Sequence, residues 1–254
     1  MSDDNKSLIN LIPDSIDNAA KNITDLPTQG IGQTLSDCWF LIFGGISQLA
    51  DKRRVKYAHS LEQYKKELEA SLSTVPEEKR IEPSSQIVLS ALDESKYCVE
   101  EEELRKLFVS LLTSATDSRK RVHPSFPSII RQMSPSDALL LRSFGSKDAL
   151  PICDIELRNP AGSRKALVRN ICLPISPEVS ERQLSLSASA LVYLGICTIP
   201  EDLFITNTTV YEPFKEFASY KALLQMQFDG KIELHKKVLQ LTPLGKAFIE
   251  CCLT

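Results

Sequence analysis

The stretch from residue 100 to residue 144 constrains the fold most, because it reads as two helices joined by a basic turn. Residues 99–116 place leucine, phenylalanine and alanine at three- and four-residue spacing, which predicts a helix with a wide apolar stripe. A stripe of this width is typical of a central helix that is contacted on several sides. Ser134-Pro135 then reads as the N-cap and first position of a second helix, residues 135–144. We therefore expect a helical domain that ends near residue 132.

Four carboxylates, Glu100 to Glu103, open the first of these helices. They fit two interpretations, a metal-binding or acid–base site and a first turn that complements the helix dipole. Consecutive residues point in different directions around a helix axis and do not converge on one ion. The dipole interpretation is therefore favoured. The basic run at residues 119–121 fits either an anion site or a solvated turn, and the solvated turn is favoured.

Composition limits the class of protein. The chain has 254 residues, 43% of them hydrophobic and 25% charged, which is ordinary for a globular protein with a sizeable core. The net charge of −3 shows no bulk basic footprint for nucleic acid. The seven cysteines are odd in number, show no C-x-x-C pair and mostly sit in apolar runs. We expect reduced core cysteines in a cytoplasmic protein, and the acidic start argues against a signal peptide.

Motifs for catalysis and for cofactors are missing from the sequence. The three histidines, His59, His123 and His235, lack metal-ligand spacing. No phosphate-binding loop, dinucleotide fingerprint or nucleophile elbow is present. We therefore expect no metal site, no cofactor and no enzymatic activity.

An apolar segment, residues 34–50, follows an acidic N-terminal segment of residues 1–33 that is expected to be partly ordered, with a short helix near residues 12–23. Its uninterrupted apolar run of residues 38–46 is too short to span a bilayer, which takes about 20 apolar residues. The segment fits a buried helix, which is favoured, or a helix lying at a membrane surface. In the second interpretation it would bind a membrane or a partner through Trp39, Phe40, Phe43, Lys52, Arg53, Arg54 and Lys56.

The second half of the chain changes to an α+β pattern. Residues 151–157 alternate as a strand, 166–174 form a return strand, and 180–194 form a helix that ends at Gly195. Residues 196–199 and 231–241 are expected to form short strands, 201–229 an irregular insertion, and 244–252 a final helix. This order is close to that of a winged helix. The predicted fold is mainly α, with a helical domain at residues 34–132 and a small winged-helix-like α+β domain at residues 133–254.

The resemblance of this order to a winged helix suggests nucleic-acid binding. Residues 180–194 would then be the helix that faces the nucleic-acid groove, and residues 231–241 would form the wing. Residues 134–254 carry 13 basic and 13 acidic side chains, which argues against it. The best nucleic-acid or anion candidates are Arg158, Arg164, Lys165 and Arg169. A hairpin whose edge is protected by solvated basic side chains is the favoured alternative.

Three local motifs are the most specific parts of this sequence: the helix ELRKLFVSLLTSATD, the step His123-Pro124-Ser125-Phe126, and Ser-Pro-x-Asp-Ala at residues 134–138. Together they resemble a bacterial family called Abi-alpha, abortive infection alpha. We expect His123 to bond a backbone carbonyl. The resemblance covers about residues 30–254 and implies a role in excluding phage, with no established catalytic residues.

Three hypotheses follow for the function. In the first, phage infection exposes residues 34–50, which then engage a membrane or a protein partner and stop bacterial growth. Replacing Trp39 and Phe43 by Asp should then abolish toxicity without unfolding the chain. The second is a nucleic-acid-binding regulator, and the third is an interaction protein with neither role. The expected location is cytoplasmic, with peripheral contact at the inner membrane under the first hypothesis.

Overall fold

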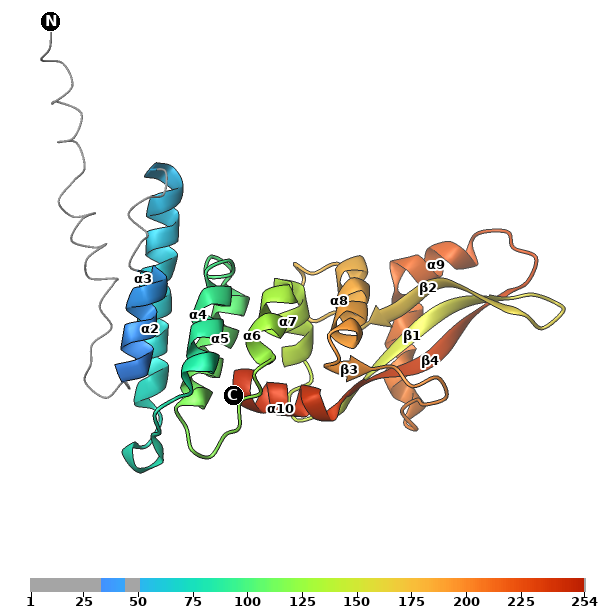
Figure 1. Ribbon diagram of the computed structural model, residues 1–254. Coiled ribbons are helices and arrows are strands. Elements are labelled where there is room, and N and C mark those ends of the chain that lie inside the picture. Colours follow the sequence, from blue (N-terminus) through green and yellow to red (C-terminus); the bar gives the residue numbers. More distant parts are fainter. Residues whose placement is uncertain (1–32, 44–50, 254) are drawn as a thin grey trace, which may run out of the picture. The chain divides into compact units, whose positions relative to one another are not determined.

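The computed structural model describes residues 33–43 and 51–253 (Figure 1). In the second range the side chains are described from Lys56 onward. The expected helix near residues 12–23 and the part of the apolar segment from residue 44 to residue 50 lie outside the described residues. The chain divides into two compact units. Unit 1 ends at Gln132 and also includes the chain from Cys251 onward, and unit 2 comprises Met133–Glu250.

Unit 1 is helical. Its elements are α2 (Gln33–Phe43), α3 (Asp51–Ser73), the 3₁₀ helix η2 (Glu77–Lys79), α4 (Ser85–Ser95), α5 (Glu102–Ala115) and α6 (Phe126–Gln132). α5 packs against α3, α4 and α6, as its wide apolar stripe predicts. Leu107, Phe108 and Leu111 on this stripe are fully buried.

The start of α5 differs from the expectation. The helix begins at Glu102, so Glu102 and Glu103 lie in its first turn, whereas Glu100 and Glu101 precede it. On α5, Arg105 donates to both carboxylate oxygens of Glu67 on α3, at 2.9 and 3.0 Å, and to the carbonyl of Val99. Arg105 therefore ties α3 to α5 as part of the scaffold.

Unit 2 combines helices with one antiparallel sheet. Its elements are α7 (Pro135–Arg142), β1 (Ala149–Arg158), β2 (Arg164–Cys172), α8 (Glu181–Tyr193), β3 (Cys197–Thr198), η3 (Thr208–Glu216), α9 (Ala218–Leu224), β4 (Lys231–Leu241) and α10 (Pro243–Cys252), of which the last two residues are assigned to unit 1. The strand order is β2-β1-β4-β3. The chain therefore joins a helical unit to an α+β unit.

The helix ends in unit 2 follow the sequence signals. Ser134 caps α7 and Ser180 caps α8, each in a capping box, in which the N-cap side chain and a side chain three residues on satisfy each other's backbone amides. Gly195 follows α8 with a φ of +74°, a left-handed conformation that glycine adopts at no steric cost. The predicted cap at Ser134 and the predicted helix end at Gly195 are confirmed.

The two faces of the sheet differ. Odd-numbered residues of β1, such as Cys153 and Ile155, join a buried cluster with Tyr211 and Phe214 of η3. Even-numbered residues Asp154 and Glu156 lie on the opposite face, because side chains alternate along a strand. The expectation that residues 201–229 are an irregular insertion was wrong, since η3 and α9 lie there and η3 covers one face of the sheet.

The expectation of one or two short strands at residues 231–241 also needs correction. β4 is one strand of 11 residues, and β1 pairs with it from Lys231 to Gln240. β3 pairs only with Gln240 and Leu241. The winged-helix assignment therefore stays a prediction.

No helix in the described ranges combines the length and the apolar character needed to cross a bilayer. The seven cysteines are all buried and none is in a disulfide, which confirms the sequence interpretation of core thiols. Burial raises the pKa of Cys172 and Cys197 to about 12. These two thiols are therefore protonated at neutral pH.

Candidate functional site

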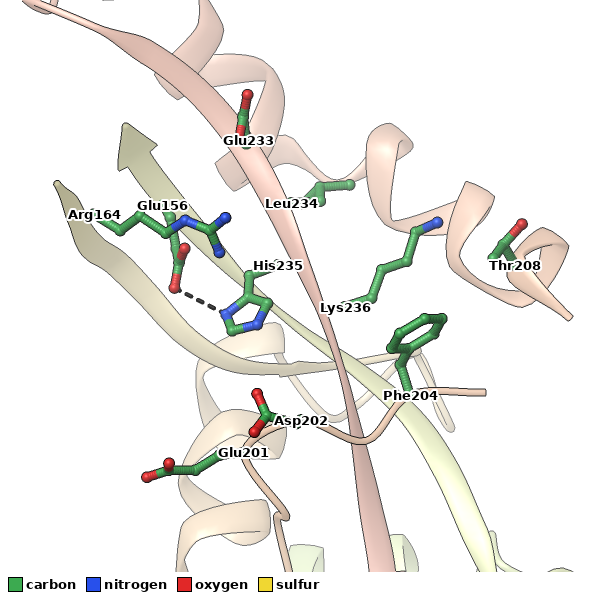
Figure 2. Close-up of a pocket in the computed structure, with 10 residues that line it drawn as sticks. All are labelled: Glu156, Arg164, Glu201, Asp202, Phe204, Thr208, Glu233, Leu234, His235 and Lys236. Atoms are coloured by element: carbon green, nitrogen blue, oxygen red, sulfur yellow. Dashed lines mark hydrogen bonds and ion pairs between the residues drawn. The ribbon is translucent and has the colours of Figure 1, made fainter. Parts of the chain in front are cut away.

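A cavity of about 440 Å³ lies beside β4, where residues 201–208 run past the part of the strand that β3 does not cover (Figure 2). Its lining contains four carboxylates, of Glu156, Glu201, Asp202 and Glu233. Two cationic side chains, Arg164 and Lys236, and His235 complete its ionisable groups. Carboxylates thus outnumber the permanent cations, which favours a positively charged ligand.

Three cross-strand pairs between β1 and β4 lead from the interior of unit 2 to this cavity. Asp154 Oδ2 lies 3.1 Å from Lys237 Nζ, and Glu156 Oε1 lies 3.0 Å from His235 Nδ1. Arg158 and Glu233 form the outermost pair, at 3.9 Å. Each pair joins residues that are offset by two positions and not directly opposite, because the register places Asp154 opposite His235 and Glu156 opposite Glu233. The antiparallel register therefore places imidazole and carboxylates in one row.

Asp154 and Lys237 form the buried end of this row. Their side chains are only 4% and 13% exposed. Asp154 Oδ1 also accepts a hydrogen bond from the backbone amide of Asn170 at 2.7 Å, and Lys237 also donates to Asn170 Oδ1 at 3.2 Å. Asn170 has a φ of +52°, which asparagine tolerates better than most residues. This network fixes the orientation of the Asp154 carboxylate.

Tyr211 holds the loop beside the cavity to the edge of β4. Its hydroxyl donates to the Lys237 carbonyl at 2.8 Å and accepts from the Ile205 amide at 2.9 Å. Burial raises the pKa of Tyr211, so the phenol keeps its proton at neutral pH. The loop that supplies Glu201 and Asp202 is therefore fixed to the same strand that supplies His235.

Asp154, Glu156 and His235 each offer one ligand atom, and these atoms all lie within 4.8 Å of one another. This group was not predicted from the sequence, because its members lack the short spacing of recognisable metal-binding motifs. Glu156 and His235 are 79 residues apart in the chain, and only the pairing of β1 with β4 joins them. The alternation Asp-x-Glu in a predicted strand was the one signal available.

The structure separates the apolar residues that sequence analysis singled out. Trp39 and Phe43 are fully buried, and the Trp39 ring lies 4.6 Å from Phe43 and 5.3 Å from Tyr64. Phe40 is 60% exposed, and its neighbour Leu41 is 71% exposed. The Asp substitutions suggested at Trp39 and Phe43 would therefore disturb the core, and they are unsuitable as surface tests.

The basic residues predicted next to this segment are only partly described. Lys52, Arg53 and Arg54 lie in α3, but their side chains fall outside the described residues. Lys56 is exposed and pairs with Glu100 at 3.2 Å.

The basic candidates of unit 2 do not form one group. Arg158 lies opposite Arg164 in the β1–β2 register, and Lys165 lies opposite Leu157, so three of them share the end of the hairpin. Arg169 is five residues further along β2, where its carbonyl accepts a bond from Ser185 of α8. Arg164 also lines the cavity.

The motif at His123, Pro124 and Phe126 opens α6. His123 Nδ1 lies 2.7 Å from the Ser125 hydroxyl and accepts from the Ser125 amide at 3.2 Å. The expected bond to a backbone carbonyl was therefore wrong, and the ring instead stabilises the turn before the helix. Pro124 is exposed, and Phe126 is fully buried.

The described residues thus define a protein with a helical unit, an α+β unit and an acid-rich cavity at the edge of its sheet. The sequence model described as Abortive infection alpha matches residues 56–252, and the chain belongs to this family. α2 lies before the matched range, although the resemblance was expected to begin near residue 30. No curated protein and no solved structure matches the chain significantly.

Proposed function

We propose that the chain is a non-enzymatic abortive infection protein that stops phage growth by binding a protein partner through α2. Membership of the family supports the biological role. The choice of α2 as the binding surface is supported by its exposed apolar side chains. Phe40 and Leu41 are 60% and 71% exposed, whereas Trp39 and Phe43 of the same helix are buried and hold it in place. Apolar side chains on one side of a fixed helix suit insertion into a hydrophobic groove.

Membrane binding through Trp39 and Phe43 is less well supported. Both side chains would have to leave the core, at a cost of about 1.5–3 kcal/mol each in lost burial. Phe40 and Leu41 are available without any opening of unit 1. We therefore favour a protein partner in the cytoplasm over peripheral contact with the inner membrane.

Replacing Phe40 and Leu41 together by Asp should abolish protection against phage. The partner's groove would then receive two charges in place of two apolar side chains, which is strongly unfavourable. Plaque counts on cells that express the variant should rise to those of cells without the protein. Far-UV circular dichroism should be unchanged, because both positions are exposed.

The matched control replaces Leu186 and Tyr193 of α8 by Asp, since these side chains are 69% and 83% exposed. This variant should protect as the wild type does. Full protection by the α2 variant, or equal loss in both variants, would contradict a specific role for α2.

Nucleic-acid binding is the second candidate, supported by the position of Arg158, Arg164 and Lys165 at one hairpin end. If it is correct, duplex DNA binding should weaken steeply with salt, because phosphate contacts release counterions. The double change Arg164→Glu and Lys165→Glu should remove that binding. Binding that is absent or insensitive to salt in the wild type would exclude it.

A further inference from the structure

We propose that Asp154, Glu156 and His235 bind one divalent transition-metal cation of the zinc class at the cavity in unit 2. This site goes beyond the proposed function and does not depend on α2. The group contains one imidazole and two carboxylates, which is a ligand set that zinc accepts. Glu156 and His235 line a cavity whose carboxylates outnumber its permanent cations, and the buried Asp154 offers its ligand atom next to theirs.

The geometry requires only small movements. Ligands of a tetrahedral zinc ion lie about 2.0–2.2 Å from the metal and hence about 3.4 Å from one another. Glu156 Oε1 and His235 Nδ1 are 3.0 Å apart, and the three ligand atoms lie within 4.8 Å of one another. The ion would replace the hydrogen that Glu156 and His235 now share. Figure 2 shows the contact between Glu156 and His235 on the wall of the cavity, where a further ligand of the ion could enter.

Lys237 limits which ions suit the site. Its ammonium lies 3.1 Å from Asp154 Oδ2, and the Asn170 amide binds Oδ1, so each oxygen keeps a further lone pair. These two partners orient Asp154, as outer contacts do in metal sites. The positive charge of Lys237 disfavours cations such as calcium and magnesium, whose binding depends mainly on electrostatic attraction. Calcium also takes six to eight oxygen ligands and magnesium about six, whereas an imidazole selects zinc-like ions.

The cysteines of the folded protein are poorly accessible to an ion. All seven are buried, and burial raises the pKa of Cys172 and Cys197 to about 12. Metal binding to a thiol requires its deprotonation. The proposed site uses only nitrogen and oxygen ligands, so its metal complex should lack the signature of thiolate ligation.

The test is isothermal titration calorimetry of the full chain, after treatment with a chelator, with zinc chloride. One ion should bind per chain, while calcium and magnesium chloride should give no binding. Cobalt(II) added in place of zinc should give visible absorption without the intense near-ultraviolet band of thiolate ligation. No zinc binding, equal binding of calcium, or a thiolate band would each overturn the proposal.

Variants assign the ligands. His235→Gln and Glu156→Gln should each weaken zinc binding by more than about tenfold, a loss at least as large as that from removing an outer contact. His123→Gln is the matched control, because His123 is an exposed histidine of unit 1 whose ring contacts Ser125. It should bind zinc as the wild type does. Wild-type affinity in His235→Gln, with circular dichroism unchanged, would overturn the proposal, as would equal loss in His123→Gln.

Discussion

Replacing Trp39 by Ala should lower the free energy of unfolding by about 3–5 kcal/mol, the range for a large aromatic side chain removed from a core. Trp39 is fully buried, and its ring packs against Phe43 and Tyr64 at centroid distances of 4.6 and 5.3 Å. Its loss would leave a cavity beside the Phe43 and Tyr64 rings. Urea unfolding should be followed by far-UV circular dichroism, because Trp39 is the single tryptophan of the chain.

Phe40→Ala is the matched control, since Phe40 is the next residue and is 60% exposed. Its free energy of unfolding should stay within about 0.5 kcal/mol of the wild type, as for most surface changes. If Trp39→Ala cost no more than Phe40→Ala, then Trp39 would not be a core residue in solution. Membrane or partner binding by Trp39 itself would then regain support.

Replacing Lys237 by Met should destabilise unit 2 by about 3–5 kcal/mol, because it leaves the buried carboxylate of Asp154 without its partner charge. The two side chains are 13% and 4% exposed. Chemical unfolding at neutral pH measures the loss. Adding Asp154→Asn to the same chain should restore part of it, because a neutral amide does not require a paired charge.

Lys246→Met provides the control for this prediction. Lys246 pairs with Asp148 at 2.5 Å, but both side chains are more than half exposed. Breaking an exposed pair should cost about 1 kcal/mol or less, because water solvates both ions. Equal losses in Lys237→Met and Lys246→Met would show that burial does not strengthen the Asp154–Lys237 pair.

Local features of this fold could be predicted from sequence because neighbouring residues determine them. The caps at Ser134 and Ser180 depend on side chains within three residues, and the turn at Gly195 depends on one glycine. The stripe of α5 likewise follows from helical spacing. The exact start of α5 could not be read, because all four acidic residues suit a first turn.

The side of α2 that is buried could not be predicted. Trp39, Phe40, Leu41 and Phe43 are all apolar, so the segment shows no clear polar face. The packing of α2 against α4 and the contact of the Trp39 ring with Tyr64 of α3 decide which side chains enter the core, and both are distant in sequence. The apolar segment is therefore compatible in sequence with both a buried helix and a helix at a membrane surface.

The candidate site at β4 required knowledge of the strand register. A shift of one residue between β1 and β4 would move His235 to the other face of the sheet, away from Glu156. The short β3 and the covering loop also depend on contacts that are distant in sequence. Neither the cavity nor its ligand group could be inferred from spacing along the chain.

The most direct test of the central claim is the survival of infected bacteria that express the wild-type chain, measured with plaque formation across a panel of phages. Abortive infection predicts that plaques are lost while the infected cells die, and that the Phe40 and Leu41 double variant restores plaques. Unchanged plaque counts on every phage, or lost plaques with surviving cells, would contradict the account.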